Sequence, residues 1–194
     1  MDSSGDMRQV MKTLFNTESF KNSINKPKVK SPTELVVGVI KQTGEFKEPT
    51  PGIHEFAVTS LNGSPFEGPL AIMGQRLMNP PTVEGWHSGR EWIDSGTLVE
   101  RVNFTAGEMG RVEAPGIQAI INRLGDEGST VSTESLVDGC LEMLGGYGLM
   151  PDTRTLLLSQ FQNASALEPG TEEFAHSIGQ MLQLIVSTQE YQFT

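Results

Sequence analysis

Ser31-Pro32-Thr33-Glu34-Leu35-Val36-Val37-Gly38-Val39-Ile40-Lys41-Gln42-Thr43-Gly44 is the stretch that decides between helix and strand in this chain. Its β-branched residues are typical of a strand. Its ends favour a helix, because Ser31 and Glu34 have the spacing of a capping box and Pro32 takes the first helical position. Gly44 is a typical helix stop. The apolar residues then share one helical face: Leu35, Val36, Val39 and Ile40.

The same start and stop signals recur along the chain, most clearly in its last third. They predict helices at 115–124, 132–144, 151–161 and 172–191, and earlier at 6–22, 52–61, 68–78 and 95–109. We expect one stripe of the 95–109 helix to face the core: Leu98, Val99, Val102, Ala106 and Met109. No strong alternating strand pattern or Asn-Gly hairpin is evident. The predicted fold is all-α, an irregular orthogonal array of about seven to nine short helices.

Composition and charge indicate one acidic helical domain with a basic N-terminal extension. Residues 1–48 hold seven Lys and one Arg against six acidic residues, whereas 49–194 hold six Arg, no Lys and eighteen acidic residues. We therefore predict an N-terminal helix and basic linker at 1–30, followed by a single helical domain at 31–194. An acidic body without lysine is a poor binder of polyanions, so we expect no nucleic-acid partner.

Other residue classes limit the chemistry and the location. The single cysteine, Cys140, excludes an internal disulfide and lies on an apolar stripe, which predicts a buried, inert thiol. No run is apolar and long enough to span a membrane, and the start is too acidic for a secretory signal. We expect a cytoplasmic protein by default. His54, His87 and His176 lack metal-ligand spacing, so neither a metal nor a cofactor is predicted.

One long loop rich in Trp, Pro and Gly, residues 79–95, is expected to be structured and central to the domain. It holds both tryptophans, and each can remove about 150–250 Å² from water when buried. One interpretation is a loop pinned to the core by Trp86 and Trp92. The other is a rigid recognition loop with polar handles. The two are compatible, and the candidate binding residues are Trp86, His87, Arg90, Glu91, Trp92 and Asp94.

Three segments resemble the bacterial family catalogued as domain of unknown function 1800. The central one contains Gly74-Gln75, Pro80-Pro81, Gly85-Trp86, Gly89-Arg90-Glu91-Trp92-Ile93 and Thr97-Leu98-Val99-Glu100-Arg101-Val102-Asn103-Phe104. The others are Lys30-Ser31-Pro32-Thr33-Glu34-Leu35-Val36-Val37 and the tail Leu182-Gln183-Leu184-Ile185-Val186-Ser187-Thr188-Gln189-Glu190-Tyr191-Gln192-Phe193. Family members are usually more than twice this long, so the resemblance implies the C-terminal portion of a larger protein. It implies no activity.

No residue pattern in the loop specifies a catalytic site. His87 next to Ser88 is not a catalytic pair without a third, orienting group, and the Gly-x-Ser-x-Gly spacing is absent. A capping role for Asp94, with Glu84 or Glu91 paired to Arg90 or Arg101, competes with a role of these carboxylates in acid–base chemistry. We therefore assign no catalytic residue.

Two functions remain open at this point. The first is a non-catalytic helical interaction or structural domain, which docks through the Trp loop onto the N-terminal half of its parent protein or onto a protein partner. It predicts an exposed apolar patch. The second is a fragment of a hydrolytic or carbohydrate-binding enzyme, and it predicts that His87, Arg90, Glu91 and Asp94 converge in a concave pocket.

Overall fold

Ten α-helices form nearly all the regular structure of the computed structural model, which describes residues 5–22, 28–44, 60–61, 64–65, 67–126, 130–146, 148–161 and 167–193. The all-α prediction is confirmed. The bounds are α1 Met7–Phe15, α2 Glu18–Asn22, α3 Pro32–Thr43, α5 Glu67–Ile72, α6 Ser95–Met109, α7 Pro115–Gly125, α8 Thr133–Met143, α9 Pro151–Gln160, α10 Glu172–Val186 and α11 Gln189–Gln192, with a 3-10 helix, η2, at Gly89–Trp92.

Helix α3 begins and ends where its sequence predicts. The Ser31 hydroxyl accepts from the backbone N–H of Glu34, and the Glu34 carboxylate accepts from the N–H of Ser31, so the capping box is complete. Gly44 closes the helix with a φ of 69°, a left-handed conformation that glycine adopts without strain. The four predicted core residues of this helix are all buried.

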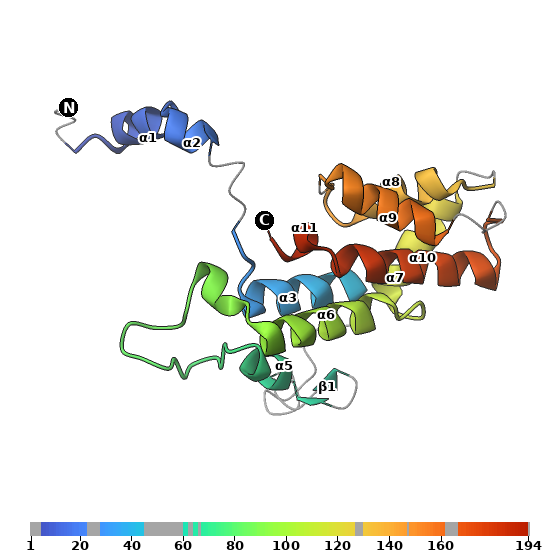
Figure 1. Cartoon of the computed structure of the whole chain (residues 1–194), viewed down its shortest axis with the longest axis horizontal. Helices are drawn as coiled ribbons and strands as arrows, with labels where there is room; N and C mark the ends of the chain where they lie inside the picture. The colour runs from blue at the N-terminus through green and yellow to red at the C-terminus, as the bar shows by residue number, and fades with distance from the viewer. Residues whose placement is uncertain are drawn as a thin grey trace.

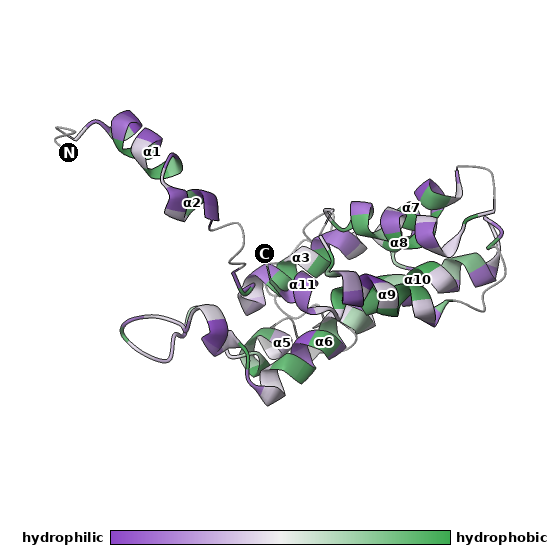
Figure 2. Ribbon diagram, turned by 45° about the horizontal axis from the view of Figure 1, so that its top comes forward, coloured by the Kyte–Doolittle hydropathy of each residue, from purple (hydrophilic) through white to green (hydrophobic). Residues whose placement is uncertain are grey.

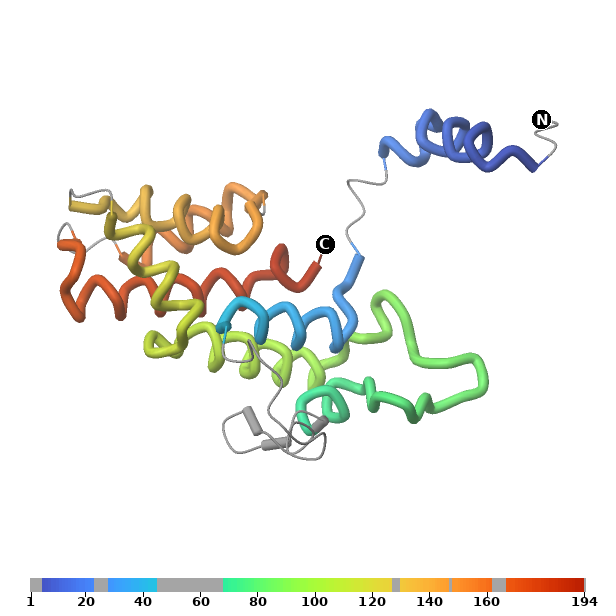
Figure 3. The backbone as a smooth tube through the Cα atoms, turned by 180° about the vertical axis from the view of Figure 1, so that it is seen from behind, coloured from blue at the N-terminus to red at the C-terminus, as the bar shows by residue number. Residues whose placement is uncertain are grey.

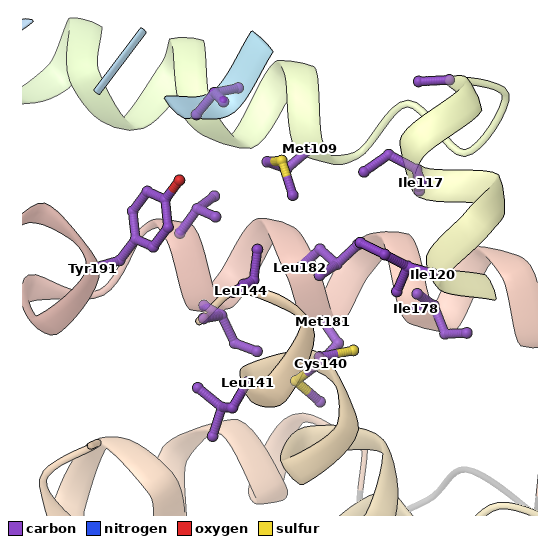
Figure 4. Packing of buried hydrophobic residues seen from close by; sticks show 14 of the residues in the cluster. Met109, Ile117, Ile120, Cys140, Leu141, Leu144, Ile178, Met181, Leu182 and Tyr191 are labelled. Carbon is purple, nitrogen blue, oxygen red and sulfur yellow. The ribbon is translucent and has the colours of Figure 1, made fainter. Parts of the chain in front are cut away.

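The core lies where α6 runs beside α3 and α10, and α7, α8 and α9 pack on other faces of α10 (Figures 1 and 3). Apolar side chains from α6, α7, α8, α10 and α11 meet there: Met109, Ile117, Ile120, Cys140, Leu141, Leu144, Ile178, Met181, Leu182 and Tyr191 (Figure 4). Cys140 is fully buried, and burial raises the pKa of its thiol to about 12. The prediction of a buried thiol is confirmed.

Helix α6 buries polar residues as well as apolar ones, and the predicted apolar stripe is wrong for Leu98 and Val99, whereas Met109 is buried and Ala106 packs against the core. Its buried residues are Arg101, Thr105, Glu108 and Met109. Leu98 and Val99 are exposed, and Val102 and Ala106 are half-buried. The reason is that hydrogen-bond partners distant in sequence lie beside α6: Gln192 of α11 and the carbonyl of Lys30 accept from Arg101, and the carbonyl of Val186 accepts from Thr105.

Two predicted helices are each divided, which explains why the helices outnumber the prediction. The 6–22 helix separates into α1 and α2 at Thr17, whose hydroxyl caps α2 by accepting from the N–H of Phe20. The 172–191 helix stops at Val186, and the hydroxyl of Thr188 caps α11. In both cases a threonine side chain offers the backbone an alternative to continuing the helix.

The predicted 68–78 helix is also shorter than expected, since α5 ends at Ile72. Gly74 has a φ of 92°, and this left-handed conformation lets the N–H of Gln75 donate to the carbonyl of Leu70. Such a hydrogen bond is typical of a helix that ends at a left-handed residue. Most of the predicted 52–61 helix, with His54, lies outside the described residues. Its last two residues are wrong as helix, because Ser60–Leu61 (β1) pairs antiparallel with Ser64–Pro65 (β2) on either side of Asn62-Gly63. Asn-Gly is a dipeptide that favours hairpins, so the expectation that the sequence contains no Asn-Gly hairpin is wrong here.

The N-terminal pair α1–α2 stands apart from the rest of the molecule (Figures 1 and 2). None of its residues is buried. Its large apolar side chains are exposed: Met7, Val10, Met11, Leu14, Phe15 and Phe20. The Phe15 and Phe20 rings, tilted by 59° with centroids 4.9 Å apart, pack the two helices together.

Candidate functional site

The loop that joins α5 to α6 projects away from the helices and returns at η2 (Figures 1 and 3). Its two arms are tied together because the Trp86 indole Nε1 donates to the carbonyl of Arg76 at 3.0 Å. A turn closes the tip, where the N–H of Gly85 donates to the carbonyl of Thr82. Val83, at this tip, is fully exposed, and the loop therefore has a defined shape with an apolar end.

The two tryptophans have different environments. Trp92 is 4 % exposed, and its ring lies against Gly74 at the end of α5. Trp86 is 37 % exposed, and its indole N–H joins the two arms of the loop. One indole anchors the base of the loop and the other maintains its outline.

The polar candidates divide into a small cluster and a helix cap. The His87 imidazole Nδ1 lies 3.6 Å from Glu91 Oε2, and its ring meets the edge of Trp92 with centroids 6.3 Å apart. Asp94 instead caps α6, where its carboxylate accepts from the N–H groups of Gly96 and Thr97. These hydrogen bonds hold the pKa of Asp94 below its usual value. The capping role weighed for Asp94 from sequence is confirmed.

The loop does not provide a catalytic arrangement in the geometry observed. The side chains of His87 and Glu91 are 54 % and 67 % exposed, and water screens a pair in such a setting. Glu91 also accepts from the N–H of Ser88, which closes the η2 capping box. None of the six candidate residues lines either of two hollows that described residues form beside the C-terminal helices.

The two hollows flank the C-terminal helices. One, of about 490 Å³, lies between α9 and the α10–α11 junction, and Leu156, Leu184 and Glu190 are among its lining residues. The other, of about 350 Å³, lies between the start of α6 and the end of the chain and is lined by Ile93, Leu98, Val102, Ser187, Gln189, Gln192 and Phe193. Both are mostly apolar.

A buried cationic cluster lies beside the smaller hollow and was missed by the sequence reading. Arg101 is fully buried, its Nε donates to Gln192 Oε1 at 3.0 Å, and its Nη2 donates to the carbonyl of Lys30 at 2.6 Å. Lys30 is 9 % exposed, and its Nζ donates to the carbonyl of Tyr191 and lies 3.9 Å from the centre of that ring. The pairing of Arg101 with a loop carboxylate, weighed from sequence, is wrong.

Burial lowers the pKa of both cations, and the charge of Arg101 adds to the effect on Lys30. Burial, then the charge of Arg101, lowers the pKa of Lys30 to about 8, against a smaller opposing effect from Glu34. Burial also lowers the pKa of Arg101 to about 10. Both groups therefore stay positively charged at neutral pH. This concentrates positive charge inside a chain whose formal net charge is −10.

A family model described as "Protein of unknown function (DUF1800)" matches residues 1–193. The chain belongs to the DUF1800 family. The match includes α1 and α2, upstream of the segments whose resemblance is evident by eye. No curated protein and no solved structure matches the chain.

The segments that carry the DUF1800 resemblance meet in space. Lys30 precedes α3, Arg101 lies on α6, and Gln192 closes α11, yet all three join in one hydrogen-bonded cluster. The backbone N–H of Lys30 also donates to the carbonyl of Gln192. Gln75, which like Arg101 belongs to the central segment, accepts from the N–H and hydroxyl of Thr33 at the start of α3. The presence of Lys30, Arg101 and Gln192 in the resembling segments was the one signal in the sequence that pointed to them.

The described residues contain no helix with the length and apolarity needed to cross a bilayer. They also contain no group of three or more His, Cys, Asp or Glu residues placed to hold a metal ion. The cytoplasmic location and the lack of a nucleic-acid partner stay predictions.

Proposed function

We propose that this chain is a non-catalytic helical interaction domain that recognises a protein surface through the projecting loop that joins α5 to α6. Following the family resemblance, the domain forms the C-terminal part of a larger bacterial protein. The surface it recognises belongs to the rest of that parent protein or to a separate protein partner.

The observation that carries this proposal is that the loop between α5 and α6 has a defined shape and exposes apolar side chains to solvent. Val83 is fully exposed at the tip, and Met78 is 94 % exposed on one arm with a φ of 61°. A positive φ is unusual outside glycine and costs conformational energy. The Trp86–Arg76 hydrogen bond preserves the shape before any partner binds, which lowers the entropic cost of binding.

Other exposed apolar surface supports an interaction role in the same way. The outward face of α6 presents Leu98 and Val99, and the detached α1–α2 pair presents its whole apolar side. Extended apolar surface of this kind marks interaction sites in soluble proteins.

The enzymatic alternative, a hydrolytic or carbohydrate-binding fragment, has less support. It requires His87, Arg90, Glu91 and Asp94 to converge in a cavity. Asp94 is committed to capping α6, and the carboxylate of Glu91 is shared between His87 and the N–H of Ser88. Neither of the two hollows in the described residues includes any of these side chains.

Site-specific photo-crosslinking tests the proposal. A photoreactive phenylalanine analogue is placed at Val83 in the full-length parent protein, in its native cells. We expect a discrete adduct, either to another segment of the parent protein or to one partner, identified by mass spectrometry. In the background of Trp86→Phe, which removes the indole donor but keeps an aromatic ring, the adduct should weaken several-fold because the loop is no longer tied.

A matched position separates recognition from random collision. Arg123, on α7, has a side chain 68 % exposed and lies outside the loop. The same analogue at Arg123 should give no discrete adduct. Equal labelling from Val83 and Arg123 would remove the loop from any recognition role.

A further inference from the structure

Helices α1 and α2, here called the N-terminal arm, offer an apolar face to solvent. Large apolar side chains recur on α1 with the three- and four-residue spacing that places them on one side of the helix: Met7, Val10, Met11, Leu14 and Phe15. They are between 39 % and 68 % exposed, and Phe20 of α2 adds a sixth at 43 %. No residue of the arm is buried, so the rest of the described chain does not cover this face.

The charged side chains of α1 are all basic. Arg8 and Lys12 are four residues apart, so they form one row along the helix beside its apolar residues. The sequence has no acidic residue between Asp6, which caps α1, and Glu18, which opens α2. Helix α1 is therefore basic and amphipathic, whereas residues 49–194 hold eighteen acidic residues against six arginines.

A lipid surface that contains anionic headgroups complements both properties of the arm. Apolar side chains of such a helix enter the boundary between headgroups and acyl chains, and basic side chains beside them attract the anionic lipids. The stems of lysine and arginine lie along apolar surface while their charged ends reach the headgroups. A bilayer also accepts a face spread over two short helices without matching its shape, which a protein groove would have to do.

The placement of the arm suits the same surface. Anionic lipids repel the acidic body, so a membrane-binding segment has to project from it, and the arm stands apart from the other helices (Figure 2). Helix α1 has nine residues, and at a rise of about 1.5 Å per residue it is only about half as long as the hydrocarbon core is thick. It therefore has the length to lie along the surface and not to cross it.

We propose that the N-terminal arm docks on an anionic lipid surface, with the apolar face of α1 in the headgroup region and Arg8 and Lys12 against the anionic headgroups. The acidic body stays in water. This inference goes beyond the proposed function, because the arm and the loop between α5 and α6 are separate surfaces and either proposal can fail without the other.

Vesicle co-sedimentation of the whole chain at pH 7 tests the proposal. Vesicles of phosphatidylcholine alone are compared with vesicles that contain about one-third phosphatidylserine, where we expect saturable binding that is roughly tenfold stronger or more. Most of this binding should be lost at about 0.5 M salt, because salt screens the attraction. Binding that is absent, or no stronger with phosphatidylserine, overturns the proposal.

Two pairs of variants locate the docking surface. Leu14→Ser, in the apolar face of α1, should weaken binding to the phosphatidylserine vesicles several-fold, whereas Leu156→Ser on α9, where the side chain is 64 % exposed, should leave it unchanged. Arg8→Gln combined with Lys12→Gln should reduce binding to the level of phosphatidylcholine alone, whereas Lys41→Gln, at an exposed position of α3, should not. The arm has no buried residue, so its variants leave the core intact. Equal effects of the arm variants and their controls overturn the assignment.

A protein groove is the other class of occupant for the arm, and a second copy of this chain is the simplest source of one. Sedimentation velocity without vesicles distinguishes it. We expect a monomer across the micromolar range for both the wild-type chain and Leu14→Ser. A dimer that forms with rising concentration and disappears in Leu14→Ser would assign the apolar face to a protein contact and overturn the lipid proposal.

Discussion

Replacing Gly116 with alanine is expected to destabilise the fold by about 3 kcal/mol or more, the upper range for overpacking a rigid contact. Gly116 is the second residue of α7, where that helix meets the end of α3. A Cβ there would collide with the carbonyl oxygen of Gln42 and lie 2.8 Å from the carbonyl carbon of Thr43. Both obstacles are backbone atoms and cannot rotate aside, so α3 or α7 must shift.

The control for this substitution is Gly107→Ala in α6. No atom lies within 4 Å of a Cβ built at Gly107. The change should therefore stabilise the protein by about 0.5–1 kcal/mol through helix propensity alone. Denaturant unfolding followed by circular dichroism gives both values. If Gly116→Ala proves as stable as Gly107→Ala, the close approach of α3 and α7 is wrong.

Most helix boundaries of this fold could be predicted from local sequence signals. The capping box at Ser31 and Glu34, the proline starts of α7 and α9, and the cap of α6 by Asp94 each act within one turn, and each lies where the sequence places it. Helix α8 also lies within its predicted bounds, and its buried residues are all apolar. Where short-range energetics and core packing agree, periodicity is sufficient.

The burial of polar residues on α6 could not be predicted from local sequence signals, and the reason is physical. Arg101 is buried because Gln192, 91 residues further on, and the carbonyl of Lys30, 71 residues before it, accept its hydrogen bonds. Nothing within one turn of Arg101 specifies those partners. The loop shows the same limit, since the Trp86–Arg76 hydrogen bond that shapes it depends on the path of the chain between them.

The pH dependence of stability should reveal the buried Lys30. Its pKa is about 8 in the folded protein against an ordinary value of 10.5. Between these two values the unfolded chain binds more protons than the folded one, so the free energy of unfolding rises with pH. Below pH 8 both states carry the charged lysine and the full cost of burying it is present. Relief of that cost should total about 3 kcal/mol, at 1.36 kcal/mol per pKa unit.

Other groups titrate in the same range, so the measurement must be a difference. Burial raises the pKa of Cys140 to about 12 from 9.0, which means that the thiol loses stabilisation as pH rises above 9 and opposes Lys30. Subtracting the unfolding free energy of Lys30→Met from that of the wild-type chain cancels this contribution. The difference should rise in favour of the wild-type chain from pH 8 upward, measured by denaturant titration between pH 7 and pH 10.

A second lysine variant separates burial from simple loss of charge. Lys41 lies on α3, close to Lys30 in sequence, but is exposed to solvent. Lys41→Met removes one positive charge without touching the cluster, and its stability should follow the wild-type pH profile in this range. If the Lys30→Met difference is as flat as that of Lys41→Met, then Lys30 is solvated at neutral pH. Among the described residues, Arg101 would then be the one cation that the fold buries.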